Sequence, residues 1–182
     1  MKKISIYAIL IMTGLFTANT VCAQSLEWGD WWIGGKIGYG HDKADNSTKT
    51  NRFYIAPEFG YDLSNNWSFG MGFGYEIMNT KLDGDKYKAK AIVLTNYARY
   101  RYLNGNVLTL FVDGGYGVAG GDTDGVQFGL SPGLSVKITD HVKLQANIGY
   151  LGYRTGHFNG GNKGFGFNLD SSDLKFGIFY LF

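Results

Sequence analysis

Large apolar residues alternate with small or charged residues along most of this chain. Between Trp67 and Ile77 every odd position is large and apolar, and the even positions hold Ser, Gly or Glu. Because successive side chains of a strand point to opposite faces, this period predicts strands with one apolar face. Segments of about ten residues are long enough to cross a bilayer when tilted. The pattern recurs in eight such segments: 31–41, 52–63, 67–77, 92–102, 108–118, 127–138, 142–150 and 173–182.

The two faces of these segments differ from those of a soluble β-sandwich. A sandwich exposes Lys, Glu and Thr on its outer face, whereas here many of the 28 glycines lie on the polar face. Small residues suit the crowded interior of a narrow barrel, and aromatic residues near the strand ends of the apolar face suit membrane interfaces. The predicted aromatic girdle contains Trp31, Tyr39, Tyr61, Trp67, Tyr102 and Tyr150. We therefore expect an all-β fold, a closed antiparallel up-and-down transmembrane β-barrel of eight strands; a soluble sandwich or lipocalin-like barrel is the alternative.

The connections alternate in length. Short ones fall at 64–66, 104–106 and 139–141. Longer, polar ones fall at about 41–51, 78–87, 119–126 and 154–170. Short turns on one side and long loops on the other are typical of bacterial outer-membrane barrels, with the turns in the periplasm. The loops 41–51, 78–87 and 154–170 are therefore the candidates for contact with an external partner.

The first 23 residues have the features of a cleavable signal peptide. Lys2 and Lys3 precede an apolar run, and Val21-Cys22-Ala23 fits signal peptidase cleavage before Gln24. The expected mature domain is 24–182. The chain has 17 Lys and Arg and 15 Asp and Glu, so without Lys2 and Lys3 it holds 15 of each. This balance argues against a nucleic-acid partner. Cys22 is the only cysteine, so no disulfide and no thiolate metal site are expected in the mature protein.

Charged residues recur on the polar face, which would line the barrel. An eight-stranded barrel is just wide enough for side chains to fill it, and charges inside it must be paired or hydrated. We expect Gly70 and Gly72 to lie opposite Arg99 and Arg101 and to make room for their guanidinium groups. The set can be a salt-bridged plug or a polar path for ions or protons. The predicted lumen charge network contains Lys36, Arg52, Glu58, Glu76, Arg99, Arg101, Asp113, Lys137 and Lys175, with Lys143 placed inside as well.

The C-terminal residues 175–182 carry a more specific pattern. Lys175 is followed by Gly177, Tyr180 and a terminal Phe182. The chain resembles the small eight-stranded outer-membrane barrels of the OmpX and OmpA-transmembrane type, in which such a pattern is the assembly signal. The resemblance implies insertion by the barrel-assembly machinery into the outer membrane, among its lipid and lipopolysaccharide. We expect a monomer with a structural or adhesive role, without catalysis, cofactor or metal.

Two other functions stay open. The second hypothesis is a narrow, low-conductance channel. The third is an enzyme that modifies lipid A, since two such enzymes use eight-stranded barrels and a His near the outer leaflet. The chain has His41, His141 and His157. Asn159 stands where the lipid A deacylase pattern has its Ser, and Asn is not a nucleophile. We therefore interpret His157 as a solvated loop residue and expect no catalytic site.

Overall fold

The structure is a computed structural model that describes residues 30–45, 48–82, 85–159, 163–169 and 174–182. The predicted signal peptide 1–23 lies outside these residues, as do parts of the predicted loops 41–51, 78–87 and 154–170. Within the described residues, no helix has the length and apolar character needed to span a membrane.

The described chain forms one closed antiparallel barrel of eight strands, which confirms the predicted fold. Some of the eight barrel strands are interrupted and consist of two labelled segments. We therefore call each of the eight a stave. Closure comes from pairing of the first and last staves, where Trp32 lies opposite Leu181. The segments are β1 (Trp31–Asp45), β2 (Thr48–Asp62), β3 (Trp67–Leu82), β4 (Asp85–Asn104), β5 (Leu108–Gly121), β6 (Gly125–Lys137), β7 (Val142–Asn147), β8 (Tyr150–Thr155), β9 (Lys163–Asn168) and β10 (Lys175–Leu181), with a short 3₁₀ turn, η1 (Gly156–Asn159).

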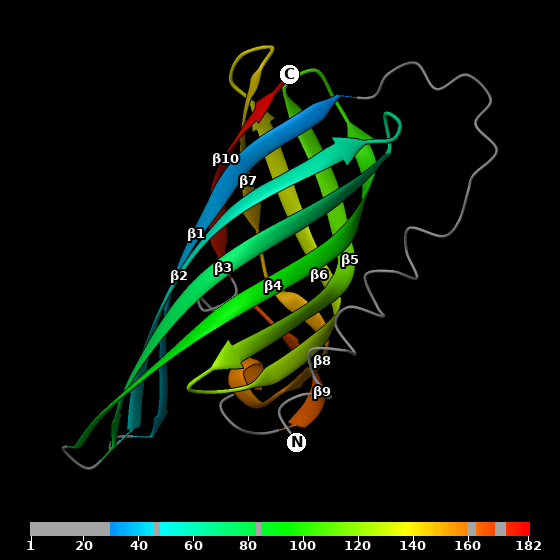
Figure 1. Cartoon of the computed structure of the whole chain (residues 1–182). Coiled ribbons are helices and arrows are strands. Elements are labelled where there is room, and N and C mark those ends of the chain that lie inside the picture. The colour runs from blue at the N-terminus through cyan, green and yellow to red at the C-terminus, as the bar shows by residue number, and fades with distance from the viewer. Residues whose placement is uncertain (1–29, 46–47, 83–84, 160–162, 170–173) are drawn as a thin grey trace.

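The two ends of the barrel differ (Figure 1). The start of β1, the C-terminus and the short turns lie at the upper end, which is the periplasmic end in the predicted topology. At the other end the hairpins β1–β2 and β3–β4 extend far beyond the rest. Most of the predicted loops 41–51 and 78–87 is therefore strand, and the loop 119–126 shrinks to residues 122–124. The sequence reading missed this because Thr, Asn, Lys and Tyr continue a strand ladder in water without an apolar face.

The seventh stave changes face partway along. Lys143, Gln145 and Asn147 share one face of β7, but β8 buries Tyr150 on that face after a break at Ile148–Gly149. Gly149 has a φ of 78°, a conformation that side chains disfavour. A break of this kind shifts every following side chain to the other face.

The shifted stave contradicts two sequence predictions. Tyr150 is 8% exposed and lies inside the barrel, so its place in the aromatic girdle was wrong. The predicted loop 154–170 contains strand β9, which pairs with β8 along six positions. The eighth stave therefore consists of β9 and β10.

The other girdle residues face outward. Trp31, Tyr39, Trp67 and Tyr102 are exposed on the outer surface. Tyr61 packs beside Trp31, with ring centroids 5.0 Å apart.

Inside the barrel, aromatic rings pack directly against glycines of the neighbouring strand. Tyr97 lies opposite Gly70, where an added methyl group would overlap its ring. Arg99 instead lies opposite Ser68. The expectation that Gly70 makes room for a guanidinium was therefore wrong, because β4 is shifted by four residues from the register that would place Arg101 opposite Gly70 and Arg99 opposite Gly72. Gly72, predicted to serve the second guanidinium, lies opposite Thr95. Trp32 with Gly60 and Phe111 with Gly133 repeat the arrangement of ring and glycine.

We predict that Gly70→Ala lowers the free energy of unfolding by about 1–3 kcal/mol, the usual range for overpacking a filled interior. The measurement is guanidinium unfolding of the refolded barrel in lipid vesicles, followed by Trp fluorescence. Gly120→Ala is the matched control, because its nearest neighbour to the added carbon is Asp124 Oδ1 at 3.8 Å. Equal losses in the two variants would contradict the packing described.

Candidate functional site

A layer of buried charges crosses the middle of the lumen. Arg99 of β4 donates to Asp113 of β5 through Nε (2.7 Å) and Nη2 (2.9 Å). The Nζ atom of Lys36 in β1 lies 3.0 Å from Oε2 of Glu58 in β2. All four side chains are at least nine-tenths buried. The layer holds two cations and two anions, so its net charge is zero.

This layer joins opposite walls of the barrel. Lys36 Nζ lies 4.0 Å from Asp113 Oδ2, although β1 and β5 are four staves apart in a barrel of eight. Arg99 Nη1 donates to Gln145 Oε1 of β7 (2.8 Å), and Asn147 Nδ2 donates to Asp113 Oδ2 (3.1 Å). The layer therefore receives side chains from β1, β2, β4, β5 and β7, and it connects them across the lumen.

Aromatic rings support the charges. The Arg99 guanidinium lies 3.8 Å from the centroid of the Phe111 ring, within cation–π range. The Tyr97 hydroxyl donates to Glu58 Oε2 (2.7 Å). The sequence reading did not single out Tyr97, Phe111, Gln145 or Asn147. Their inward positions follow from the alternation, but their contacts depend on the register and on the opposite wall.

A second ion pair lies near the end of the barrel that carries the short turns. Arg101 Nη2 donates to Asp62 Oδ1 (2.7 Å), which also accepts from Trp32 Nε1 (3.1 Å). Arg101 Nη1 reaches the carbonyl oxygens of Ser64 (3.3 Å) and Asn65 (3.4 Å) in the first short turn. Arg101 therefore fixes this turn to the barrel wall as well as filling the lumen.

Lys137 does not belong to the lumen network. Its side chain is 41% exposed at the end of β6 and lies 2.7 Å from Asp140 of the following turn. The hydrogen bond from Lys137, together with its charge, lowers the pKa of the exposed Asp140 carboxyl. The prediction failed because the barrel wall ends here. Lys143 is half-buried inside the wall.

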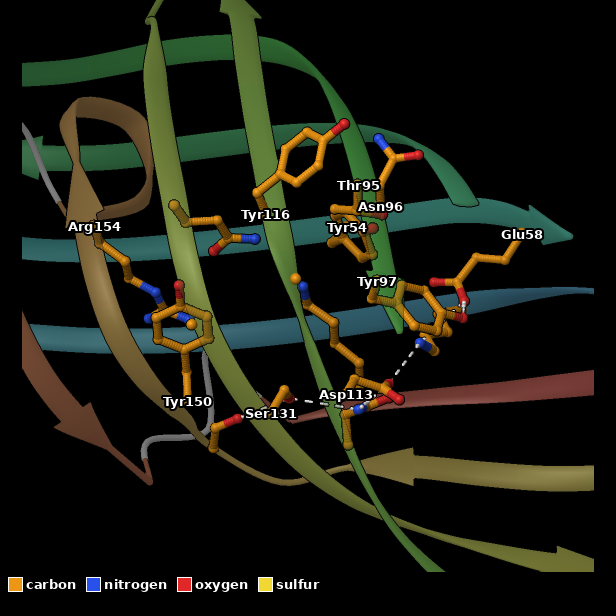
Figure 2. A pocket seen from close by; sticks show the side chains of 17 residues that line it. Tyr54, Glu58, Thr95, Asn96, Tyr97, Asp113, Tyr116, Ser131, Tyr150 and Arg154 are labelled. Carbon is orange, nitrogen blue, oxygen red and sulfur yellow. Dashed lines mark hydrogen bonds and ion pairs between the residues drawn. The ribbon is translucent and has the colours of Figure 1, made fainter. Parts of the chain in front are cut away.

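The half of the lumen on the side of the hairpins holds a cavity, which we call the vestibule. A cavity of about 90 Å³ lies between Tyr54, Tyr97, Asp113 and Tyr150, and Figure 2 shows these side chains around it. A second cavity of about 30 Å³ continues past Arg52 and Glu76. Cations and rings alternate along the wall: Arg154 lies 3.7 Å from the Tyr150 ring centroid, and Lys175 lies 4.2 Å from that of Tyr54.

His157 is buried beside Glu76, a residue that lines the second cavity. It is 1% exposed, so its interpretation as a solvated loop residue was wrong. Nδ1 lies 2.7 Å from Thr123 Oγ1, and Nε2 lies 3.2 Å from Glu76 Oε2. The backbone N–H of His157 donates to the carbonyl of Asp124 (3.0 Å) and folds η1 inward. No local sequence signal reports this tertiary contact.

The remaining predicted residues have simpler positions. His41 contacts Asn51, and His141 contacts the carbonyl of Leu181. In the C-terminal pattern, Gly177 is buried, whereas Tyr180 and Phe182 are exposed on the outer face. Their role in assembly stays a prediction. Among the described residues, no three His, Cys, Asp or Glu side chains gather as a metal site would require.

We predict that Arg99→Met lowers the free energy of unfolding by about 3–5 kcal/mol, because it leaves the Asp113 charge buried without its main partner. The double variant Arg99→Met/Asp113→Leu should lose less than Arg99→Met alone. Guanidinium unfolding of the refolded barrels measures the cycle. Losses that simply add would show that the two residues are not coupled.

Two solved outer-membrane proteins are similar to this chain. OprG from Pseudomonas aeruginosa has a similar structure with a TM-score of 0.50 at 14% identity; the match covers 88% of this chain and 99% of that one. Ail, the attachment invasion locus protein of Yersinia pestis, matches with a TM-score of 0.42 at 15% identity, over 85% of this chain and 95% of that one. No curated protein matches the sequence.

The sequence model of the outer membrane protein beta-barrel domain matches residues 8–182, nearly the whole chain. It therefore covers every stave of the barrel and both layers of lumen charges. The chain belongs to the outer membrane protein beta-barrel domain family and is a protein of the outer membrane.

Proposed function

We propose that this protein is a structural outer-membrane barrel whose lumen is closed to ions and whose long hairpins serve as contact surfaces. The observation that supports a closed lumen is the contact between opposite walls, from Lys36 to Asp113, inside a layer built from five staves. A permeating ion would have to separate these buried pairs, which is costly without hydration.

The vestibule fits the same proposal. Its cavities lie on the hairpin side of the central layer, and the Arg101–Asp62 pair lies on the other side. The narrow channel, the second hypothesis from the sequence, would need a continuous path past both layers.

Single-channel recording in a planar bilayer tests the closed lumen. We predict that the refolded wild type is silent and that Arg99→Ala/Asp113→Ala produces conductance steps, because both walls lose their contact and no net charge is left behind. Lys137→Ala/Asp140→Ala is the matched control, since it removes an exposed ion pair at the rim. Steady conductance by the wild type would refute the closed lumen.

The second candidate function is acyl-ester hydrolysis on a lipid at the outer leaflet. Its specific observation is the sequence of contacts Thr123 Oγ1–His157–Glu76, in which a hydroxyl, a base and a carboxylate follow one another. The burial of His157 favours the structural proposal. In a hydrolase the imidazole would also have to protonate the leaving group of the substrate, and a side chain that is 1% exposed is not accessible to one.

Mass spectra of lipid A from cells that overproduce the protein distinguish these two functions. The structural proposal predicts identical spectra for the wild type, Thr123→Ala and the empty vector. Loss of an acyl chain with the wild type, absent with Thr123→Ala and retained with His141→Ala, would establish the hydrolase instead.

A further inference from the structure

Four lysines occupy directly opposite positions on four neighbouring strands of the extended hairpins. The register places Lys43 opposite Lys49, Lys49 opposite Lys81, and Lys81 opposite Lys86. We call these four residues the lysine row. Like charges directly opposite each other destabilise a sheet. The lysines therefore repel one another in the free protein, and an anionic partner would turn this repulsion into a net attraction.

Two further lysines connect the row to the membrane boundary. Lys88 and Lys90 follow Lys86 at alternate positions of β4, so the three share one face. Lys81, Lys86, Lys88 and Lys90 are exposed, and none forms an ion pair within the described part of the chain. The carboxylate of Asp122 accepts from the backbone N–H of Lys90, not from its ammonium group.

The same outer face becomes apolar directly after Lys90, on the side away from the hairpin tips. Ile92 is 67% exposed, and the register continues from it through Tyr75 and Ile55 to Ile37. This apolar row marks the edge of the lipid-facing band that is nearest the hairpins. At roughly 3.3 Å per residue, Lys90 lies about 7 Å and Lys86 about 20 Å along the strand from Ile92. With the usual tilt of about 40°, the lysines lie roughly 5–15 Å from the apolar row along the barrel axis, toward the hairpin tips.

We propose that the exposed lysines of this surface, Lys81, Lys86, Lys88 and Lys90, bind the phosphate groups of lipopolysaccharide, the phosphorylated glycolipid of the outer leaflet. Ammonium groups bind phosphate as point charges. The proposal rests on the outer-membrane location, which the family establishes, and it is independent of whether the lumen is closed.

The position of Lys90 favours a glycolipid over a soluble polyanion. A soluble partner would contact the tips of the hairpins and would gain nothing from a lysine beside Ile92 and Ile77. A glycolipid anchored in the same leaflet places phosphates from the hydrocarbon boundary upward, alongside the outer face of β3 and β4. The ladder of lysines from Lys90 to Lys86 follows that direction.

The test titrates the refolded full-length barrel, in zwitterionic detergent, with bisphosphorylated lipid A and with the same lipid A after removal of its phosphates. Native mass spectrometry measures binding to the wild type and to Lys81→Gln/Lys86→Gln/Lys88→Gln/Lys90→Gln. We expect the wild type to prefer the phosphorylated form by about tenfold or more and the variant to lose this preference. Lys137→Gln/Lys163→Gln is the matched control, with two exposed lysines outside the surface.

Three results would overturn the proposal. The first is a wild type that does not distinguish the two lipids. The second is a folded quadruple variant, verified by its heat-modifiable gel mobility, that binds as the wild type does. The third is tighter binding of a sulfated oligosaccharide than of lipid A, lost in the variant, which would assign the surface to a soluble polyanion. If the quadruple variant fails to fold, Lys88→Gln/Lys90→Gln replaces it, with a partial loss of preference expected and an unchanged preference overturning the proposal.

Discussion

The narrow lumen of an eight-stranded barrel is the constraint on which this structure depends. Charged side chains that point into it have little water to solvate them, so each needs an opposite charge within reach. Lys36, Glu58, Arg99 and Asp113 meet this need together. Because Lys36 and Asp113 come from opposite walls, their contact at 4.0 Å also links the two walls of the barrel.

Inside the lumen, aromatic rings pack against glycines of the neighbouring strands. Tyr97, Trp32 and Phe111 lie across Gly70, Gly60 and Gly133, where any larger side chain would collide with the ring. The rings in turn support the ions, as Phe111 does for Arg99. Glycine, ring and ion thus form one packing unit, which explains why the polar face of the strands is rich in glycine.

The alternation of apolar and small residues was sufficient to predict the barrel and the inward direction of Lys36, Glu58, Arg99 and Asp113. It could not predict which charges meet, because cross-lumen contacts depend on register. The actual register pairs Gly70 with Tyr97, four residues away from Arg101. A local break at Gly149 turned Tyr150 inward. The burial of His157 depends on residues far away in the sequence, Thr123 and Glu76, that no local pattern connects to it.

The Arg99 guanidinium is held by fixed partners in the middle of the lumen, and the two ion-pair layers depend on this. NMR of the refolded, ¹⁵N-labelled barrel can observe it through the guanidinium N–H signals of Arg99, assigned by comparison with Arg99→Lys. We expect separate, slowly exchanging Nη signals and a hydrogen-bonded Nε–H, because Asp113 and Gln145 restrain the group. A single averaged Nη signal in fast exchange with water would instead show a hydrated, mobile arginine and would refute the closed lumen.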